Sequence, residues 1–269
     1  MEKSGSNARG LARAILLGAA LALLAAGRTP AGDAKLAAIE AAKTVRIAVP
    51  QGSPPFGFTD SDMELIGYDI DMADLIAKGL GVKLESVPVT STNRVPYLSS
   101  GRADLIISSL GKNPEREKVI DFTQAYAPFY SGVFGPADIA VKGPGDLDGK
   151  TVSVTRGSVE DLELTKIISG LVDMRRFEDG SAVVAAYLSG QVQLIAVGNV
   201  VAGSLNARNP AKPLEPKFMI KNSPCYIGLP RDEPALKAKL NAIIADLKKT
   251  GKIAELCEKW LNIPMPADL

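Results

Sequence analysis

Hydrophobic and polar residues recur along the chain with the periods of strands and helices, which marks the predicted elements. Residues 44–49 alternate in the manner of a strand, and residues 83–89 form a second predicted strand. Residues 67–81 carry apolar side chains at helical spacing, acidic residues at the start and a glycine where helices commonly end. A short helix over 94–100 leads into a third strand, Leu105–Ile107. This alternation predicts a mostly parallel sheet flanked by helices.

The pattern is interrupted over residues 136–150, which are rich in Gly, Pro and Asp, and it then restarts. The elements predicted around and after this interruption are strands near 132–134, 151–154, 175–178 and 194–197, and helices over 159–169 and 181–189. A tight turn at Gly157, next to Arg156 and Ser158, precedes the first of these helices. A second and smaller α/β unit is therefore expected.

The C-terminal segment is predicted to return to the first unit. It contains a strand over 226–229 and helices over 232–250 and 252–261. We therefore expect a discontinuous first domain, residues 44–132 and 224–269, with a second domain, residues 133–223, inserted into it. Two segments then cross between the domains, an arrangement that predicts a hinge and a cleft.

The N-terminal residues 1–31 are predicted to be a cleaved signal peptide. Three basic residues precede an unbroken apolar run of 13 residues from Ala14 to Ala26, which is too short to span a membrane comfortably. Small residues follow, and cleavage near Ala31 fits them. No cysteine follows the run, so we expect no lipid anchor and a soluble periplasmic protein.

Composition excludes several kinds of function. The 269 residues are 46% hydrophobic and 23% charged, with a formal net charge of +1, which gives no support for nucleic-acid binding. Histidine is absent, which removes Ser-His and Cys-His catalysis and any imidazole-based metal site. Asp69, Asp71 and Asp74 are expected to complement the helix dipole on a solvated face rather than to bind metal. We expect no metal and no cofactor.

The stretch from Asp104 to Arg116 is the strongest candidate for chemistry. Its apolar run, Leu105 to Ile107, ends in small polar residues such as Ser108 and Ser109, whose backbone amides and hydroxyls are unhindered. A predicted helix begins at Pro114. Amides, a helix start and one arginine together suit a carboxylate. A solvated arginine in an ordinary strand-to-helix loop is the alternative.

Two further features leave alternatives open. Cys225 and Cys257 are the only cysteines, so an oxidising compartment allows one disulfide, whereas two buried thiols are the alternative. Phe56 and Phe58 lie in a turn-rich loop after the first strand, where ligands are commonly bound in α/β sheets. At least one of these two rings is expected to fill the local core instead.

Several runs together resemble the periplasmic amino-acid-binding proteins of ABC importers, the polar amino acid type of solute-binding protein family 3. The runs are Pro54-Pro55-Phe56-Gly57-Phe58, Ile66-Gly67-Tyr68-Asp69-Ile70-Asp71, Ser108-Ser109, Pro114-Glu115-Arg116, Val119-Ile120-Asp121-Phe122 and Glu258-Lys259-Trp260. The similarity covers residues 44–262 in the family's order and spacing. It implies a two-lobed type II binding-protein fold whose two-strand hinge closes on a small ligand.

The resemblance also implies a ligand site and partners. Arg116 is expected to fork onto the ligand carboxylate, with help from Ser109, the amide of Gly111 and the turn at Ser158. The full set of predicted ligand-binding residues is Ser53, Phe56, Ser91, Ser109, Gly111, Arg116, Ser158, Glu160 and Asn199. The expected partners are an amino acid or related carboxylate and the transmembrane subunits of an ABC permease, with the receptor itself a monomer.

The sequence departs from the family where the ligand ammonium is usually bound. The aspartate expected after the strand 194–197 is missing, because Gly198 and Asn199 stand there. Asn199 could offer a neutral acceptor, Glu160 or Asp161 could substitute, or the ligand could lack an ammonium group. Ser53 and Ser91 thin the usual aromatic clamp, and the additional cations Arg94 and Arg156 favour an acidic or strongly polar ligand.

Two other functions are compatible with the same scaffold. A cyclohexadienyl dehydratase-like enzyme would need a general acid in a dry cleft, and Glu160 is the leading candidate for it. A sensory ligand-binding lobe is the third interpretation, although no second transmembrane or signalling segment follows in the sequence. A receptor without catalytic activity is the favoured interpretation.

Overall fold

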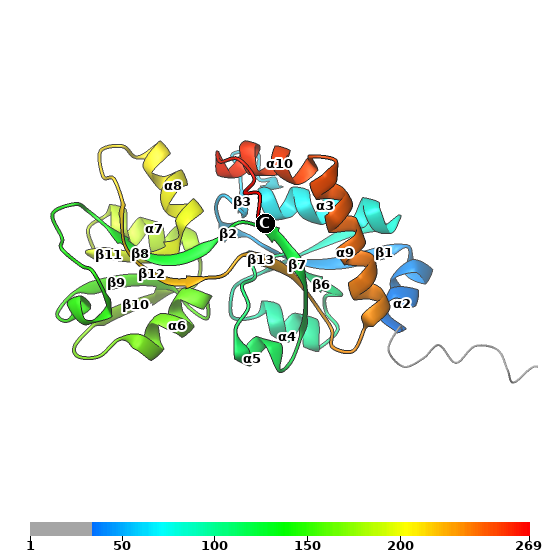
Figure 1. Ribbon diagram of the computed structural model, residues 1–269, viewed down its shortest axis with the longest axis horizontal. Helices are drawn as coiled ribbons and strands as arrows, with labels where there is room; N and C mark the ends of the chain where they lie inside the picture. The colour runs from blue at the N-terminus through cyan, green and yellow to red at the C-terminus, as the bar shows by residue number, and fades with distance from the viewer. Residues whose placement is uncertain (1–33) are drawn as a thin grey trace, which may run out of the picture.

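The computed structural model describes residues 34–269, which form two five-stranded sheets placed side by side (Figure 1). We call the part of the chain that carries the first sheet lobe 1 and the part that carries the second sheet lobe 2. The predicted signal peptide, residues 1–31, lies outside the described residues. Within residues 34–269, no helix combines the length and the apolar character needed to cross a membrane.

The sheet of lobe 1 is mixed rather than purely parallel. Its strands, in spatial order, are β5 (Lys83–Val89), β1 (Thr44–Pro50), β6 (Leu105–Ile106), β13 (Cys225–Leu229) and β7 (Asp121–Ala127). Strand β1 pairs in parallel with β5 and β6, whereas β13 runs antiparallel to β6 and β7. The helices of this lobe are α2 (Ala34–Ala42), α3 (Tyr68–Leu80), α4 (Arg94–Ser99), α5 (Pro114–Glu117), α9 (Pro234–Lys249) and α10 (Lys252–Leu256), followed by the π-helical turn η3 (Cys257–Leu261).

Successive residues of the lobe 1 strands enter different cores, one on each face of the sheet. Val45, Ile47 and Val49 of β1 pack with the cluster under α3, α9 and α10, whereas Ala48 packs with the cluster that includes Leu98 of α4. The alternation follows from the two-residue period of a strand. Helices on both faces explain why the central strand β6 is entirely apolar and buried.

Lobe 2 repeats this arrangement on a smaller scale. Its strands, in spatial order, are β10 (Asp173–Phe177), β9 (Thr151–Thr155), β11 (Leu194–Gly198), β8 (Tyr130–Gly135) and β12 (Glu215–Asn222). Strand β9 pairs in parallel with β10 and β11, and β8 is antiparallel to its neighbours β11 and β12. The helical elements are the 3-10 turn η2 (Pro144–Leu147) and the helices α6 (Val159–Ile167), α7 (Gly180–Leu188) and α8 (Asn199–Arg208).

Two short segments connect the lobes, residues 128–129 between β7 and β8 and residues 223–224 between β12 and β13. The amide of Ser223 donates to the carbonyl of Phe129 over 3.3 Å, so the two crossings are bonded to each other. The discontinuous first unit and the inserted second unit match the expected topology. The exact domain boundaries stay a prediction, and β8 begins at Tyr130, slightly before the expected boundary at 133.

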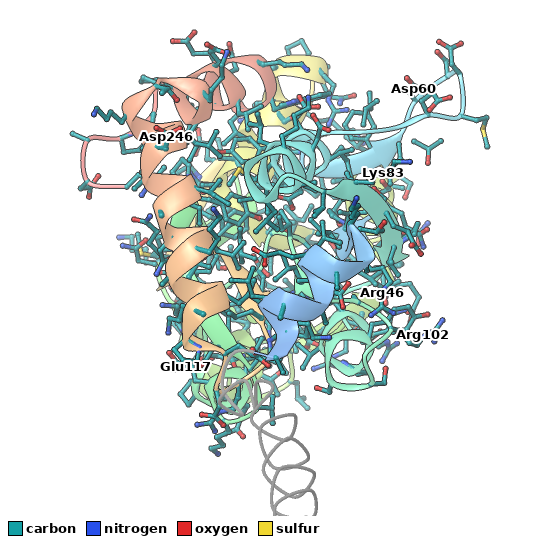
Figure 2. The ribbon with its side chains drawn as sticks, turned by 90° about the vertical axis from the view of Figure 1, so that its right-hand side faces the viewer. Arg46, Asp60, Lys83, Arg102, Glu117 and Asp246 are labelled. Carbon is teal, nitrogen blue, oxygen red and sulfur yellow. The ribbon has the colours of Figure 1, made fainter. Side chains whose placement is uncertain are left out.

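Three local structures were not expected. The loop after β1 forms a small sheet from β2 (Gly52–Ser53), β3 (Gly57–Thr59) and β4 (Leu65–Ile66). Strand β12 and helix α8 were not expected either. The start of helix α2 contacts the sheet through an ion pair between Lys35 and Asp104, just before β6. Arg46 of β1 pairs with the same carboxylate, and Figure 2 shows Arg46 beside α2.

The disulfide allowed by the sequence, between Cys225 and Cys257, is not formed in the structure. Cys225 and Cys257 are both free thiols buried in the main core of lobe 1. The Cys257 sulfur lies 3.8 Å from the Tyr68 hydroxyl, and Cys225 is fixed in β13 opposite Ala127. Burial raises the pKa of both thiols, which keeps them protonated and unreactive.

Candidate functional site

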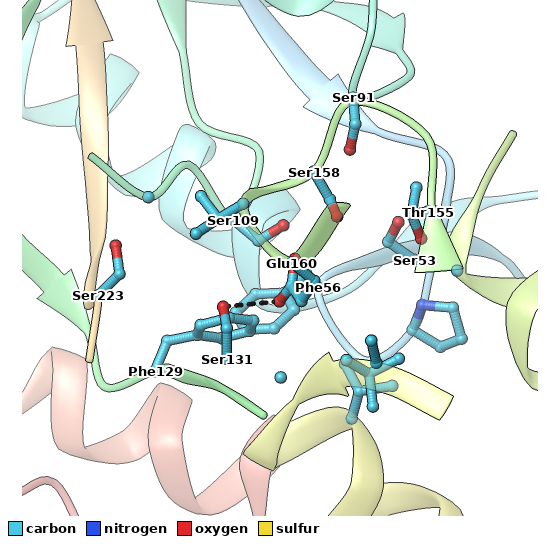
Figure 3. A pocket seen from close by; sticks show the side chains of 18 of the residues that line it. Ser53, Phe56, Ser91, Ser109, Phe129, Ser131, Thr155, Ser158, Glu160 and Ser223 are labelled. Carbon is cyan, nitrogen blue, oxygen red and sulfur yellow. Dashed lines mark hydrogen bonds between the residues drawn. The ribbon is translucent and has the colours of Figure 1, made fainter. Parts of the chain in front are cut away.

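A cavity of about 60 Å³ lies between the two lobes, where β1, β6, β9 and β11 end (Figure 3). Loops at the carboxyl ends of strands meet here from both sheets, which is the usual ligand position in α/β proteins. Seven of the nine predicted ligand-binding residues line it: Ser53, Phe56, Ser91, Ser109, Gly111, Ser158 and Glu160. Arg116 and Asn199 do not line it.

Arg94 is the cation in the cavity wall. The residue is only 3% exposed, and its Nη1 donates to the carbonyl of Ser108, while its buried Nε has no partner in the described structure. Burial lowers the pKa of Arg94, and the negative charges of neighbouring groups, Glu160 first among them, oppose that effect. A buried guanidinium with an unused donor indicates that an anion is bound here.

Among residues 34–269, Glu160 is the only carboxylate that lines the cavity, and it comes from the opposite lobe. It lies in the first turn of α6, is 7% exposed, and accepts a hydrogen bond of 2.9 Å from the hydroxyl of Ser131 (Figure 3). Asp161 serves the helix instead, because its carboxylate accepts from the Gly157 amide and pairs with Arg176 at 2.7 Å. Of the two acidic substitutes considered from sequence, only Glu160 faces the cavity.

Arg116 is buried but its donors are turned to the protein. Nη1 donates to the carbonyl of Gly111 over 2.7 Å, and Nη2 donates across the cleft to the carbonyl of Gly157 over 3.0 Å. Burial, reinforced by the positive charge of Arg94, lowers the pKa of Arg116 to about 9. The structure therefore places Arg116 behind the cavity wall, where it bonds the two lobes to each other.

The loop at Ser109 is held by a buried aspartate. Asp69 accepts a hydrogen bond of 2.6 Å from the Ser109 amide and another of 2.6 Å from the Tyr126 hydroxyl. Ser109 has a φ of 40°, an unusual conformation for a residue with a side chain. Burial raises the pKa of Asp69 to about 7, despite these two donors. The solvated face expected for Asp69 was wrong, and Ser109 offers the cavity its hydroxyl rather than its amide.

Phe129 explains the missing acid at the end of β11. A β-carbon added at Gly198 would lie 2.0 Å from Cζ of Phe129, so the ring fills the space of a side chain at residue 198. The ring also packs on Phe56, with centroids 5.8 Å apart. Asn199 cannot replace the acid, because its side-chain oxygen accepts from the Tyr130 amide over 3.0 Å.

The remaining sequence candidates lie elsewhere. Arg156 forms an exposed pair with Glu178, so it is a surface charge and not a cation of the cleft. Phe58 packs edge-on against Trp260, and Phe56 is buried at the cavity. The cavity residues that were not predicted include Phe129, Ser131, Thr155 and Ser223. Phe129, Ser131 and Ser223 lie in or next to the two segments that cross between the lobes. Their position at the predicted hinge is the sequence signal that could have identified them.

Comparison with known protein families agrees with this two-lobed geometry. The sequence pattern of the bacterial extracellular solute-binding proteins, family 3, matches residues 45–263. The chain belongs to this family. The expected family and its two-lobed fold are therefore confirmed, and family 3 proteins are receptors of the ABC-transporter type.

Relatives of known structure or function support the same assignment. The L-cystine-binding protein TcyJ of Escherichia coli (strain K12) is 26% identical over 94% of this chain and 96% of its own length. An ancestral arginine-binding protein bound to arginine is 31% identical, with a TM-score of 0.74, over 81% of this chain and 98% of that chain. The ancestral amino acid-binding protein AncCDT-1, a precursor of cyclohexadienyl dehydratase, is 27% identical, with a TM-score of 0.76, over 84% and 99%.

Proposed function

We propose that this family 3 protein is a periplasmic receptor that encloses one small zwitterionic amino acid and delivers it to an ABC permease. The observation that carries the proposal is the pair of opposite charges on the two cavity walls, Arg94 on lobe 1 and Glu160 on lobe 2. A zwitterion is the simplest ligand that neutralises both. Related proteins named for L-cystine and arginine support an amino acid as the ligand class.

In this proposal the guanidinium of Arg94, which lines the cavity and has a donor without a protein partner, binds the carboxylate of the ligand. Arg116 contributes positive charge from behind the wall, and its bond to Gly157 helps to hold the lobes together. Charge-assisted hydrogen bonds contribute about 1.5–3 kcal/mol each, so the carboxylate should account for much of the affinity.

Glu160 binds the ammonium group and takes the place of the aspartate missing at Gly198. In the described structure its carboxylate accepts a hydrogen bond from the Ser131 hydroxyl, which leaves acceptor positions for a cation. The charged groups of the two walls belong to different lobes, so a ligand that bridges them stabilises the closed arrangement. Each chain supplies both walls, and we propose that it acts as a monomer.

A thermal-shift panel tests this function. Stabilisation by a ligand grows with its concentration relative to its Kd. L-amino acids should raise the Tm, whereas simple amines and 2-keto acids, which each lack one of the two charges, should raise it much less. Equal stabilisation by a 2-keto acid and its amino acid would contradict a zwitterionic ligand.

We further propose that the protein is not an enzyme. The alternative is a dehydratase. Glu160 is a buried glutamate in the cavity, and the chain is similar to a precursor of cyclohexadienyl dehydratase. Incubation with candidate cyclohexadienyl substrates, followed by mass spectrometry, should detect no product. Turnover that disappears in Glu160→Gln would establish the enzyme instead.

A further inference from the structure

Ser223 is a second polar group in the cavity that the protein itself leaves without a partner. The residue lines the cavity and is 3% exposed, its Oγ is buried, and no hydrogen bond to this atom exists in the described structure. Buried hydroxyls almost always have a partner, because burying one without a hydrogen bond costs free energy. The orphaned hydroxyl therefore indicates a polar ligand group at this place.

The position of Ser223 is the hinge end of the cavity. It lies on the second crossing between the lobes, and its amide is bonded to Phe129 on the first crossing. Figure 3 shows Ser223 and Phe129 at one end of the cavity, and Ser53 and Thr155 at the other. A ligand group that reaches Ser223 therefore lies next to the segments that move when the lobes open and close.

The hinge end has little free space. A β-carbon added at Gly111 would lie 2.6 Å from Oγ of Ser223 and 2.9 Å from Cγ2 of Val159. Gly198 has no room for a side chain either, because the Phe129 ring occupies it. Only a short ligand substituent fits between these groups.

We infer that Ser223 hydrogen-bonds the side chain of the bound amino acid, and that this side chain is short and carries a neutral hydrogen-bonding heteroatom. The inference rests on the proposed function, in which Arg94 and Glu160 take the charged ends of the ligand. The neutral hydroxyl of Ser223 is then left for the neutral part. A hydroxyl can both donate and accept, so it suits a ligand hydroxyl, thiol or amide.

Isothermal titration calorimetry with matched ligand pairs tests this inference. The probes are L-serine against L-alanine, and L-cysteine against L-2-aminobutyrate, which differ in one heteroatom. Wild-type protein should bind the first member of a pair about tenfold more tightly, the fold-change expected for one hydrogen bond. Ser223→Ala should bind both members of that pair with equal affinity.

Ser153→Ala is the matched control. Ser153 is also fully buried, but its hydroxyl already donates to the carbonyl of Val183 over 3.3 Å and does not line the cavity. This variant should lose some thermal stability, since it removes a buried hydrogen bond, and keep the preference for the heteroatom. Ser223→Ala should keep or raise its ligand-free Tm, because it removes a buried hydroxyl that has no partner.

The outcomes separate the inference from the proposed function. If wild-type protein binds amino acids but binds the two members of each pair with equal affinity, the inference is overturned and the receptor function stands. An equal loss of affinity for both members in Ser223→Ala, or no loss in a folded variant, also overturns it. If no amino acid binds at all, the proposed function fails first.

Discussion

The two walls of the cavity obtain their charge in different ways. On lobe 1, two buried guanidiniums, Arg94 and Arg116, lie close enough for one to lower the pKa of the other. On lobe 2, the carboxylate of Asp161 is neutralised by Arg176, and Glu160 is left as the one acid in the cavity wall. Among the described residues of lobe 1, Asp69 is the one carboxylate near the two guanidiniums, and its pKa is about 7. Lobe 1 therefore carries excess positive charge at the cavity, and lobe 2 carries excess negative charge. The difference teaches that the ligand completes a charge pattern that neither lobe balances alone.

The largest effect is expected from removing the lobe 1 cation. Arg94→Met keeps most of the side-chain volume but removes the charge and its donors, so amino-acid affinity should fall by about 100-fold, which corresponds to about 2.7 kcal/mol. Calorimetry on the folded variant measures this. Arg156→Met on lobe 2 is the control, because Arg156 is an exposed surface charge and should not affect binding. Similar affinity losses in both variants would contradict the difference between the walls.

A smaller effect should follow from restoring the missing acid on lobe 2. Gly198→Asp places a side chain against the Phe129 ring, so the free energy of unfolding should fall by about 1–3 kcal/mol, as is usual for overpacking. Adding Phe129→Ala should recover part of that stability. Urea unfolding of both variants checks this, and a Gly198→Asp protein as stable as wild type would show that the ring does not limit this position.

The buried carboxylate behind the lobe 1 wall should make stability depend on pH. The pKa of Asp69 is raised to about 7 in the folded protein, from 3.8. Its contribution to the free energy of unfolding is therefore fully present below pH 3.8 and is lost as pH rises to about 7, by at most about 1.4 kcal/mol per pH unit.

Urea unfolding of wild type and Asp69→Asn between pH 4 and pH 8 isolates this contribution, because all other groups are shared. The stability of wild type relative to the variant should decrease from pH 4 to pH 7 and then stay constant. A difference that does not change with pH would exclude titration of Asp69 in this range.

The smallest effect concerns the core of lobe 1. Both thiols are free and buried, so Ellman's reagent should detect two thiols in denatured protein and almost none in native protein. Reducing agent should leave the Tm unchanged. No reactive thiol after denaturation would restore the disulfide between Cys225 and Cys257.

Sequence patterns predicted most of the fold because they depend on local periodicity. Strand β5 and helix α3 lie where the pattern placed them, to within one residue at each end. Helix α8 and strand β12 were missed for local reasons as well. Helix α8 follows Gly198 directly and contains a glycine of its own, and β12 includes Pro216 and has exposed positions at a sheet edge.

The site was predicted less completely because its decisive contacts join distant residues. Asp69 is buried by Ser109 and Tyr126, which are 40 and 57 residues away in the sequence. The ring that replaces the acid at Gly198 likewise comes from the first crossing. Local sequence indicates which residues carry charge, but only the packing of the lobes decides that Arg94 faces the cavity and Arg116 does not.

The most direct test of the opposite charges on the two walls is calorimetry of one amino acid and its matching 2-keto acid. The amino acid identified by the thermal-shift panel is titrated into wild type, Glu160→Gln and the surface control Glu178→Gln. In wild type and in the control, affinity for the amino acid should exceed affinity for the keto acid by about tenfold or more. Glu160→Gln should lose this preference. A folded Glu160→Gln protein that keeps the full preference would contradict the assignment of Glu160 to the ammonium group.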